Sequence, residues 1–522
     1  MSQIDVIKEN VQYEQLLREG STNHVLKGEY LIKDSHPDAH QILGVDAKAT
    51  VTNKEILADK VMIEGQINYS VLYLSEDESG TQRVDSVNLS EKFADYLELN
   101  NEEHKILCDV ECVIEHIQAN IMNERKISID GVRSTKWNIY KIQDLEFVKD
   151  IEGSGDVQVQ RKNEELNQVK GQKDIEFIGK SLIKVTMDKP EVDEILKYSM
   201  MLHKKEVKLG ENKVYFGCYC KIEVLYKGRD SEDLVVLQDD VYLSKEEELV
   251  GANSEMMTSH NIDVVNSDCT VMPDDLGENR NISIEFVARG DVKVMSRESV
   301  EVVKDAYSPT VTMDLVENNC EIGVVHGNMT TDLILKDNLY LKDENERLGN
   351  IIMVYGCPVI ADKTAEEDKV KIEGIIKVSA LYKTADEGYK VDMCNGEIPF
   401  TSVLDIKGTK PDMNVIAKVQ LESIDGTIEA NTIAIRATLS VSVNVLYNVN
   451  KEWIVDVVQN KEEKKEKKSS VTIYVVNKGD TLWELAKKFN TTMDELIRVN
   501  DMENPDSINI GQRIIIPGRA IF

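Results

Sequence analysis

Two short stretches of the sequence contain residues whose types and spacing resemble those of phosphate-binding or metal-binding motifs. Residues 177–181 (FIGKS) end like a phosphate-binding loop, in which glycines let the backbone fold around phosphate groups. The first glycine of that motif would fall at Asp174, so the backbone cannot wrap phosphate in the usual way. Residues 36–40 (HPDAH) have metal-like spacing, but Pro37 and its polar neighbours favour a turn, and no third ligand is evident. Neither stretch predicts a working site.

The eight cysteines are scattered and form no C-x-x-C pair, which predicts reduced thiols in a cytosolic protein. Cys218 and Cys220 lie two residues apart in a strand-like run, so they share one face and suit buried small hydrophobes better than a metal site. There is no G-x-S-x-G, no H-E-x-x-H and no cysteine beside a plausible histidine. Pairs of Asp and Glu residues are abundant, but in a chain this acidic such pairs are usually solvated surface residues rather than catalytic pairs. The sequence therefore predicts no catalytic residue, no cofactor and no metal site, and so a protein that is not an enzyme.

Length and charge narrow the class of protein. A chain of 522 residues is too long for one core and predicts three or four units. The formal net charge of −32 disfavours nucleic acid and bare anionic membrane as partners. The N-terminus has no signal-peptide pattern, and no run approaches the roughly 20 apolar residues of a membrane span. We therefore expect a cytosolic protein with no direct membrane insertion.

The first twenty residues have helix-like apolar spacing. Ile4, Ile7, Val11 and Leu17 would share one side of an amphipathic helix over residues 1–20, and Gly20 would end it. Such a helix would either pack on its own domain or dock on a partner.

Three later stretches share one pattern: KVMIEGQINYSVLY (60–73), KVYFGCYCKIEVLY (213–226) and KVKIEGIIKVSALY (369–382). An apolar pair precedes each stretch and an Ile-x-Ile follows it, at a period of about 155 residues. This order predicts one domain used three times, at residues 21–152, 175–308 and 320–459.

Alternating apolar residues and abundant β-branched residues predict strands in these stretches, and the turn-like residues after each Leu-Tyr predict hairpins. We therefore expect a mainly β protein, in which each repeat is an antiparallel sandwich or a partly closed barrel. The shared tyrosines, Tyr73, Tyr226 and Tyr382, would serve either as core or edge anchors or as binding residues.

The end of the chain has a different composition. Residues 460–470 (NKEEKKEKKSS) predict a charged, flexible linker spanning about 20 Å, which would present the tail away from the body. Beyond it, the pattern predicts a strand at 473–476, a turn at 477–480, helices at 482–489 and 493–500, and a strand at 513–516. The pairs Thr481/Glu484 and Thr492/Glu495 would form capping boxes at the two helix starts.

This βααβ tail, residues 471–518, resembles a LysM domain over nearly its full length. The predicted core is Leu482, Leu485, Ala486, Leu496 and Ile514. The resemblance implies a shallow ligand groove between two loops. Carried over by position, its partner-binding residues are Gly479, Asp480, Thr481, Leu482, Trp483, Asn504, Pro505, Asp506, Ser507, Ile508, Asn509 and Ile510. Trp483 would either cover the core or serve as an exposed recognition anchor.

The third repeat resembles the SPOCS domain of endospore coat proteins, in VKIEGIIKVSALY, IPFTSVLDIKGTKPDMNVIAKVQLESIDG and IAIRATLSVSVNVL. Three such repeats and a terminal LysM domain together resemble the coat morphogenetic proteins of spore-forming bacteria. The resemblance implies a scaffold in the mother-cell cytoplasm, at the forespore surface, that drives coat encasement. Its LysM domain would bind the coat's basement-layer ATPase, of the SpoIVA type, with other coat proteins as further partners.

Two other functions remain open. A cell-wall or cortex protein would use the LysM domain for peptidoglycan and its N-acetylglucosamine, but it would need an export route. A component of a phage-tail-like assembly fits the missing signal peptide but not the triple repeat.

Overall fold

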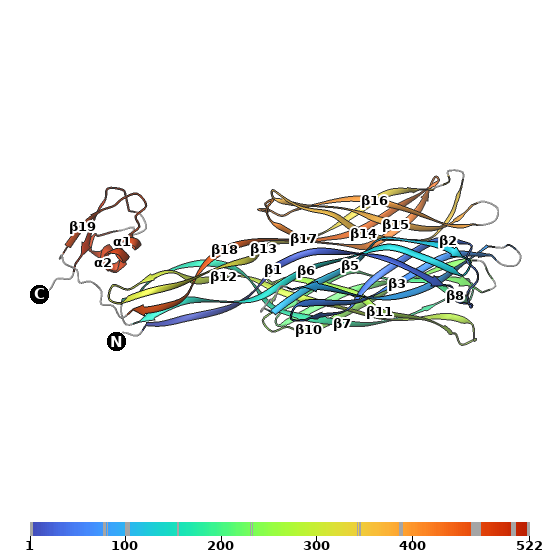
Figure 1. Ribbon diagram of the computed structural model, residues 1–522, viewed down its shortest axis with the longest axis horizontal. Helices are drawn as coiled ribbons and strands as arrows, with labels where there is room; N and C mark the ends of the chain where they lie inside the picture. The colour runs from blue at the N-terminus through green and yellow to red at the C-terminus, as the bar shows by residue number, and fades with distance from the viewer. Residues whose placement is uncertain are drawn as a thin grey trace.

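The body of the protein is built almost entirely of long β-strands (Figure 1). The computed structural model describes residues 4–76, 80, 82–99, 105–153, 156–229, 231, 233–341, 343, 346–385, 390–460, 471–502 and 508–518. Repeat one consists of β1 (Ile4–Leu31), β2 (Gln41–Ile56), β3 (Lys60–Glu76), β4 (Gln82–Glu98), β5 (Lys105–Asn123) and β6 (Lys126–Gly153). Repeat two consists of β7 (Gln158–Lys184), β8 (Val192–Gly210), β9 (Lys213–Gly228), β10 (Leu234–Glu248), β11 (Met257–Pro273) and β12 (Asn279–Tyr307). Repeat three consists of β13 (Thr312–Tyr340), β14 (Leu348–Glu366), β15 (Lys369–Thr384), β16 (Val391–Asp405), β17 (Asn414–Glu429) and β18 (Thr432–Asn460).

Each repeat is a sandwich of two three-stranded antiparallel sheets. In repeat one, the meander β2-β3-β4 faces the sheet β5-β6-β1, and the other repeats have the same order. The sheets of repeats one and two also touch at Tyr13 and Gln168, which joins them into six strands. Alternating side chains of β3, β9 and β15 point into the three separate cores, as the period-2 pattern requires. The predicted antiparallel β-class is confirmed, and no closed barrel forms among the described residues.

The Leu-Tyr pair shared by the repeats faces two ways. Its tyrosines are buried in the cores of their own repeats, and each phenolic OH donates a hydrogen bond to a residue 36 positions earlier. The acceptors are Pro37 O for Tyr73, Pro190 O for Tyr226 and Glu346 Oε2 for Tyr382, at 2.8–3.1 Å. The leucines point the other way, into one apolar cluster where all three repeats meet; they are Leu72, Leu225 and Leu381. The tyrosines are therefore core anchors, and the leucines join the repeats around a common axis.

Beyond the sandwiches, the first and last strands of each repeat continue as a long two-stranded antiparallel ribbon. The three ribbons pack together into a narrow extension, which we call the stalk (Figure 1). Its core draws on all six long strands and includes Val11, Phe147, Leu166, Val302, Ile322 and Trp453. Trp453 is 2% exposed, and its ring lies 5.5 Å from that of Phe147.

The predicted N-terminal helix is wrong: from Ile4 onward this segment is β1, paired with β6 along its whole length. Two β-bulges change which side of β1 faces inward: Lys149 of β6 is the extra residue opposite Ile7 and Lys8, and Leu17 is the extra residue within β1. They break the period-2 alternation, so the apolar residues fall at a helix-like spacing. Gly20 does not end a helix; it lies in mid-strand against the ring of Trp137. The first strand of every repeat also begins earlier than the predicted starts at residues 21, 175 and 320, because the strands of the stalk belong to the repeats.

The tail has the predicted βααβ order: β19 (Val471–Val475), α1 (Leu482–Lys488), α2 (Met493–Val499) and β20 (Arg513–Pro517). The capping box at Thr481 and Glu484 is present in both directions. At α2 only half of the second box forms: Thr492 accepts from Glu495 N, whereas the Glu495 carboxylate accepts from Thr491 Oγ1. All five predicted core residues are buried together. The predicted linker at 460–470 lies outside the described residues from 461 onward.

Neither α1 nor α2 is long and apolar enough to cross a bilayer, and the described residues contain no other α-helix.

Candidate functional site

The first loop of the predicted LysM groove is held by a compact hydrogen-bond network. Asp480 accepts from Asn477 N at 2.8 Å and from Tyr474 OH at 2.9 Å, and these hydrogen bonds lower the pKa of its carboxyl group. Gly479 has φ +97°, which favours glycine, and a Cβ added there would meet nothing within 4 Å. The loop is therefore fixed in shape and open to solvent.

The second groove loop is described only from Ile508 onward, so Asn504, Pro505, Asp506 and Ser507 lie outside the described residues. Gly511 N donates to Val476 O at 2.8 Å, which holds this loop beside the end of β19. Asn509 is exposed and Ile510 is 70% exposed. Within the described residues, no hydrogen bond or ion pair connects Gly479–Thr481 or Ile508–Ile510 to the body.

Two residues assigned to the groove have other positions. Leu482 is 3% exposed and packs in the LysM core, so it offers no surface to a ligand. Trp483 is half-buried, and its Nε1 donates to Asp305 Oδ2 of repeat two at 2.8 Å. Its ring meets that of Tyr307 edge-on, with centroids 5.0 Å apart. The tail is thus docked on the body, contrary to the expectation that the linker presents it away.

The phosphate-loop-like and histidine-rich stretches are both structural. Residues 177–181 lie within β7, where the Gly179 backbone is extended and Phe286 covers it. Residues 36–40 lie in the loop between β1 and β2, after a turn that His36 N closes by donating to Lys33 O at 2.9 Å. Arg125 Nη1 donates to the carbonyl oxygens of Lys33 and His36, and Arg280 makes the equivalent bonds in repeat two. No group of three potential metal ligands occurs among the described residues.

Cys218 and Cys220 lie side by side in the core of repeat two, as predicted, and both are fully buried. Burial raises the pKa of Cys218 to about 11 and that of Cys220 to about 12. These thiols stay protonated at neutral pH. Because the thiolate is the form that binds metals and attacks electrophiles, they are poorly suited to either role. No disulfide bond joins any two of the eight cysteines, all of which lie among the described residues.

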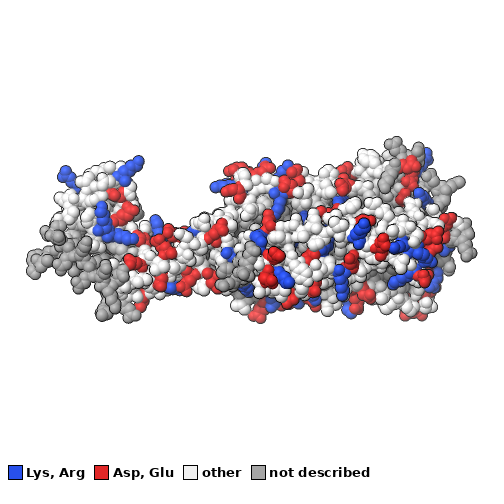
Figure 2. All heavy atoms as spheres, viewed as in Figure 1, with Lys and Arg blue, Asp and Glu red and all other residues white. Residues whose placement is uncertain are grey.

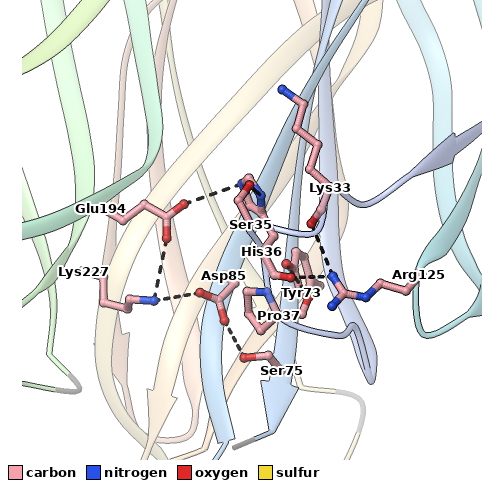
Figure 3. A network of polar contacts seen from close by, with 10 residues as sticks. All are labelled: Lys33, Ser35, His36, Pro37, Tyr73, Ser75, Asp85, Arg125, Glu194 and Lys227. Carbon is pink, nitrogen blue, oxygen red and sulfur yellow. Dashed lines mark hydrogen bonds and ion pairs between the residues drawn. The ribbon is translucent and has the colours of Figure 1, made fainter.

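The His36 turn takes part in a polar contact between repeats one and two (Figure 3). The Asp85 carboxylate is 2% exposed; it accepts from Ser75 Oγ and pairs with Lys227 Nζ at 2.7 Å. Lys227 also lies 3.7 Å from Glu194, which in turn lies 3.9 Å from His36. Burying a carboxylate is costly unless it is paired, so the buried Asp85 of repeat one depends on Lys227 of repeat two.

A second buried charge joins all three repeats. Lys197 of repeat two is 3% exposed; its Nζ lies 2.8 Å from Asp46 of repeat one and 3.4 Å from the ring centroid of Tyr355 of repeat three. Sequence analysis missed this contact and the one at Asp85, because each partner lies in a different repeat.

A cavity of about 1,570 Å³ lies between the repeats, lined by strands of all three. Lysine side chains in its lining are paired with acceptors from other repeats. Lys48 lies 2.9 Å from Asp263, and Lys205 Nζ donates to Gln420 Oε1 at 3.0 Å. Burial, and next the charge of Lys418, lower the pKa of Lys205 to about 8. This cavity could not be predicted, because it forms only when three repeats associate.

Comparison with protein-family models matches the SipL SPOCS domain three times, at residues 38–122, 191–272 and 348–429, and the LysM domain at 474–517. These domains bind or support other molecules and are not catalytic. The chain is thus a repeated SPOCS protein that carries a LysM module. Three SPOCS domains followed by one LysM domain are the SipL-like architecture, and this chain has it.

Individual relatives resemble the chain only in the LysM region. The cortical fragment-lytic enzyme of Bacillus subtilis is 47% identical over 45 residues, 9% of this chain and 10% of that protein. The endolysin of Bacillus phage B103 is 41% identical over 63 residues, 12% and 24% of the two chains. The spore coat assembly protein ExsA of Bacillus cereus is 42% identical over 50 residues, 9% and 8%. The chain thus spans less than a quarter of each of these relatives. No solved structure matches it significantly.

Proposed function

We propose that the protein is a non-enzymatic scaffold of spore coat assembly, whose LysM domain docks on the SpoIVA-type basement-layer ATPase. The observation that carries this proposal is the combination of three SPOCS repeats with one LysM domain. A relative of the LysM region named for spore coat assembly supports the same process. In this proposal the protein acts in the mother-cell cytoplasm at the forespore surface and drives encasement of the spore by coat.

The two parts of the protein have separate tasks in this proposal. The body is a stiff assembly of three sandwiches joined by shared apolar clusters and buried charges, which suits a spacer or platform. The LysM loops around Gly479 and Ile510 face solvent, which suits docking. Covering the exposed Ile510 side chain with a protein partner would remove its apolar surface from water, which favours association.

Peptidoglycan binding is the alternative, since two of the relatives are named as a cortex-lytic enzyme and an endolysin. Both ligands would use the same loops, so a comparison of the two separates the functions. We expect the purified full chain to bind the basement ATPase and to show no measurable binding to N-acetylglucosamine oligomers or peptidoglycan. Sugar binding without ATPase binding would contradict the proposal.

A matched pair of variants tests the docking face. Ile510→Asp should weaken ATPase binding at least tenfold, because it places a charge on the exposed groove loop. Ile473→Asp is the control: Ile473 is 64% exposed on β19 and belongs to neither groove loop. Equal effects of the two substitutions would contradict use of the groove. Leu482 is unsuitable for this test because its substitution would unfold the LysM core.

A further inference from the structure

The LysM domain rests on the end of repeat two through an aromatic contact that is largely buried. Tyr307, the last residue of β12, is 5% exposed and belongs to the LysM core cluster rather than to the core of its own repeat. Its OH donates to Thr491 O at 2.9 Å, a bond buried from solvent. Its ring meets that of Trp483 at an interplanar angle of 76°, a favoured edge-to-face arrangement.

Polar contacts surround these two rings. Asp305 accepts from Trp483 Nε1 and pairs with Lys487 Nζ at 2.6 Å, and Gln158 Oε1 accepts from Met493 N at 3.3 Å. Figure 2 shows basic side chains of the LysM domain beside acidic side chains of the stalk at this junction. The contact thus combines an apolar centre with a charged rim, which is the usual arrangement of a specific interface.

The three repeats can be compared at this place, because the last strand of each repeat has a β-bulge near its end. An aspartate follows the bulge in every repeat: Asp150, Asp305 and Asp456. Asp150 pairs with Arg161 on the first strand of repeat two. Asp456 lies 3.7 Å from Lys8 on the first strand of repeat one. Two of the three aspartates therefore find a cation on the next repeat around the axis.

The third aspartate, Asp305, differs because the next repeat has no cation at the corresponding position. The registers place Glu317 of repeat three where Lys8 and Arg161 stand in the other two. The pKa of Glu317 is raised, and the main cause is its hydrogen bond with the neighbouring Glu452. The charge of Asp305 raises this pKa further, whereas the charge of Lys487 lowers it. The stalk therefore gathers three carboxylates at this corner, and the LysM domain supplies the cation that the repeat lacks.

Tyr307 is also specific to this corner. The equivalent residues at the ends of β6 and β18 are Glu152 and Val458, by the same registers. Neither can provide an aromatic ring and a hydroxyl donor together. Only one corner of the stalk is therefore built to receive the LysM domain.

We propose that this corner, formed by Tyr307, Asp305 and Glu317, is a dedicated docking site for the LysM domain of the same chain. It fixes the LysM domain in one orientation, with Trp483 committed to the body and the loops at Gly479–Thr481 and Ile508–Ile510 left open. An external ligand of those loops is thereby held at a set position relative to the stalk. Intramolecular docking gains from a high effective concentration, so a modest contact suffices. The inference does not depend on which ligand the loops bind.

Zero-length carbodiimide cross-linking of the full chain at low protein concentration tests this site. It joins a lysine to a carboxylate only when the two groups touch. We expect Lys487 to become linked to Asp305, detected as a joined peptide by mass spectrometry. Tyr307→Ala should lower the yield at least tenfold, and Tyr307→Phe severalfold, because it loses only the bond to Thr491. Trp483→Ala should act like Tyr307→Ala from the other side of the contact.

The matched controls are Glu152→Ala and Val458→Ala, at the equivalent positions of the other two repeats. Both should leave the Lys487–Asp305 yield unchanged, and circular dichroism should show that all variants keep their strand content. An unchanged yield in both Tyr307→Ala and Trp483→Ala would overturn the proposal. So would equal linkage of Lys487 to Asp150 or Asp456, since that would show a domain with no preferred corner.

Discussion

At the scale of single residues, the buried Lys197 side chain brings groups of all three repeats into contact. The Lys197 ammonium group is enclosed by Asp46 and Tyr355, yet Asp46 lies 151 residues away in the chain. Nothing local distinguishes this lysine from the many on the surface. A buried cation without its carboxylate is strongly destabilising, so such a group favours one way of packing three similar repeats over others. We offer this role in selecting the register as a hypothesis.

Within the LysM domain, the residues predicted correctly are those with local signals. Leu485 and Ala486 follow the helical period, and the box of Thr481 with Glu484 spans one turn. The position of Trp483 could not be resolved from sequence because its partner, Asp305, lies 178 residues away. The assignment of Leu482 to the groove failed because the helix turns that side chain inward.

His260 makes stability depend on pH in a predictable direction. Burial, and next the charges of Lys418 and Lys205, lower the pKa of His260 from its ordinary 6.5 to about 4. Between pH 6.5 and pH 4 the unfolded chain therefore binds a proton that the folded chain does not, so this group makes stability fall as the pH falls. Relative to wild type, His260→Gln should gain stability progressively from pH 6.5 to pH 4. Free energies of unfolding in urea, measured for both proteins across this range, check it; a difference that stays constant with pH would contradict it.

At the scale of elements, the β-bulges determine whether the facing position of the next strand can hold a side chain. In repeats one and three, a glycine stands in the middle strand of the meander, at Gly65 and Gly374. A one-residue bulge on the neighbouring strand brings a carbonyl oxygen close to each glycine. Repeat two has Cys218 at this position. The bulge there also has one extra residue, since Lys204 and Lys205 together lie opposite Cys218, but Lys204 has φ +48°. The departure of the second sequence from the Glu-Gly pattern thus coincides with a bulge of different backbone conformation.

This difference predicts opposite tolerance at equivalent positions. A Cβ at Gly374 would lie 2.4 Å from Val359 O and 2.5 Å from the Phe400 ring, and a backbone oxygen cannot move away cheaply. Gly374→Ala should therefore cost about 3 kcal/mol of stability, at the upper end for overpacking. Cys218→Ala, at the equivalent site, should cost only about 1 kcal/mol for the lost buried sulfur. Urea denaturation of the two variants checks the difference, and equal costs would contradict this account of the bulge.

At the scale of the whole molecule, the sequence predicted the repeats but not their assembly. The period of about 155 residues and the alternating strands were enough to predict three β-rich units. The surfaces that join the units could not be predicted from sequence, because Leu72, Leu225 and Leu381 follow the same apolar pattern as core residues. An apolar residue that faces a neighbouring repeat is indistinguishable in sequence from one that faces its own core. The stalk was missed for a related reason, since its strands are stabilised by each other across repeats.

Because apolar clusters bridge all three repeats at two levels, we expect the body to unfold as one cooperative unit. Leu225 is fully buried at the junction with Leu72 and Leu381, and it lies outside the separate core of its own repeat. Leu225→Ala should cost about 3 kcal/mol, the low end for a buried leucine. Since 1.4 kcal/mol is tenfold in an equilibrium, amides that exchange through global opening should exchange roughly a hundredfold faster. The test is whether this acceleration, followed by hydrogen exchange and mass spectrometry, extends to the slow amides of β3 and β15. If only repeat two loses protection while repeats one and three keep theirs, the repeats fold independently and the junction merely joins finished domains.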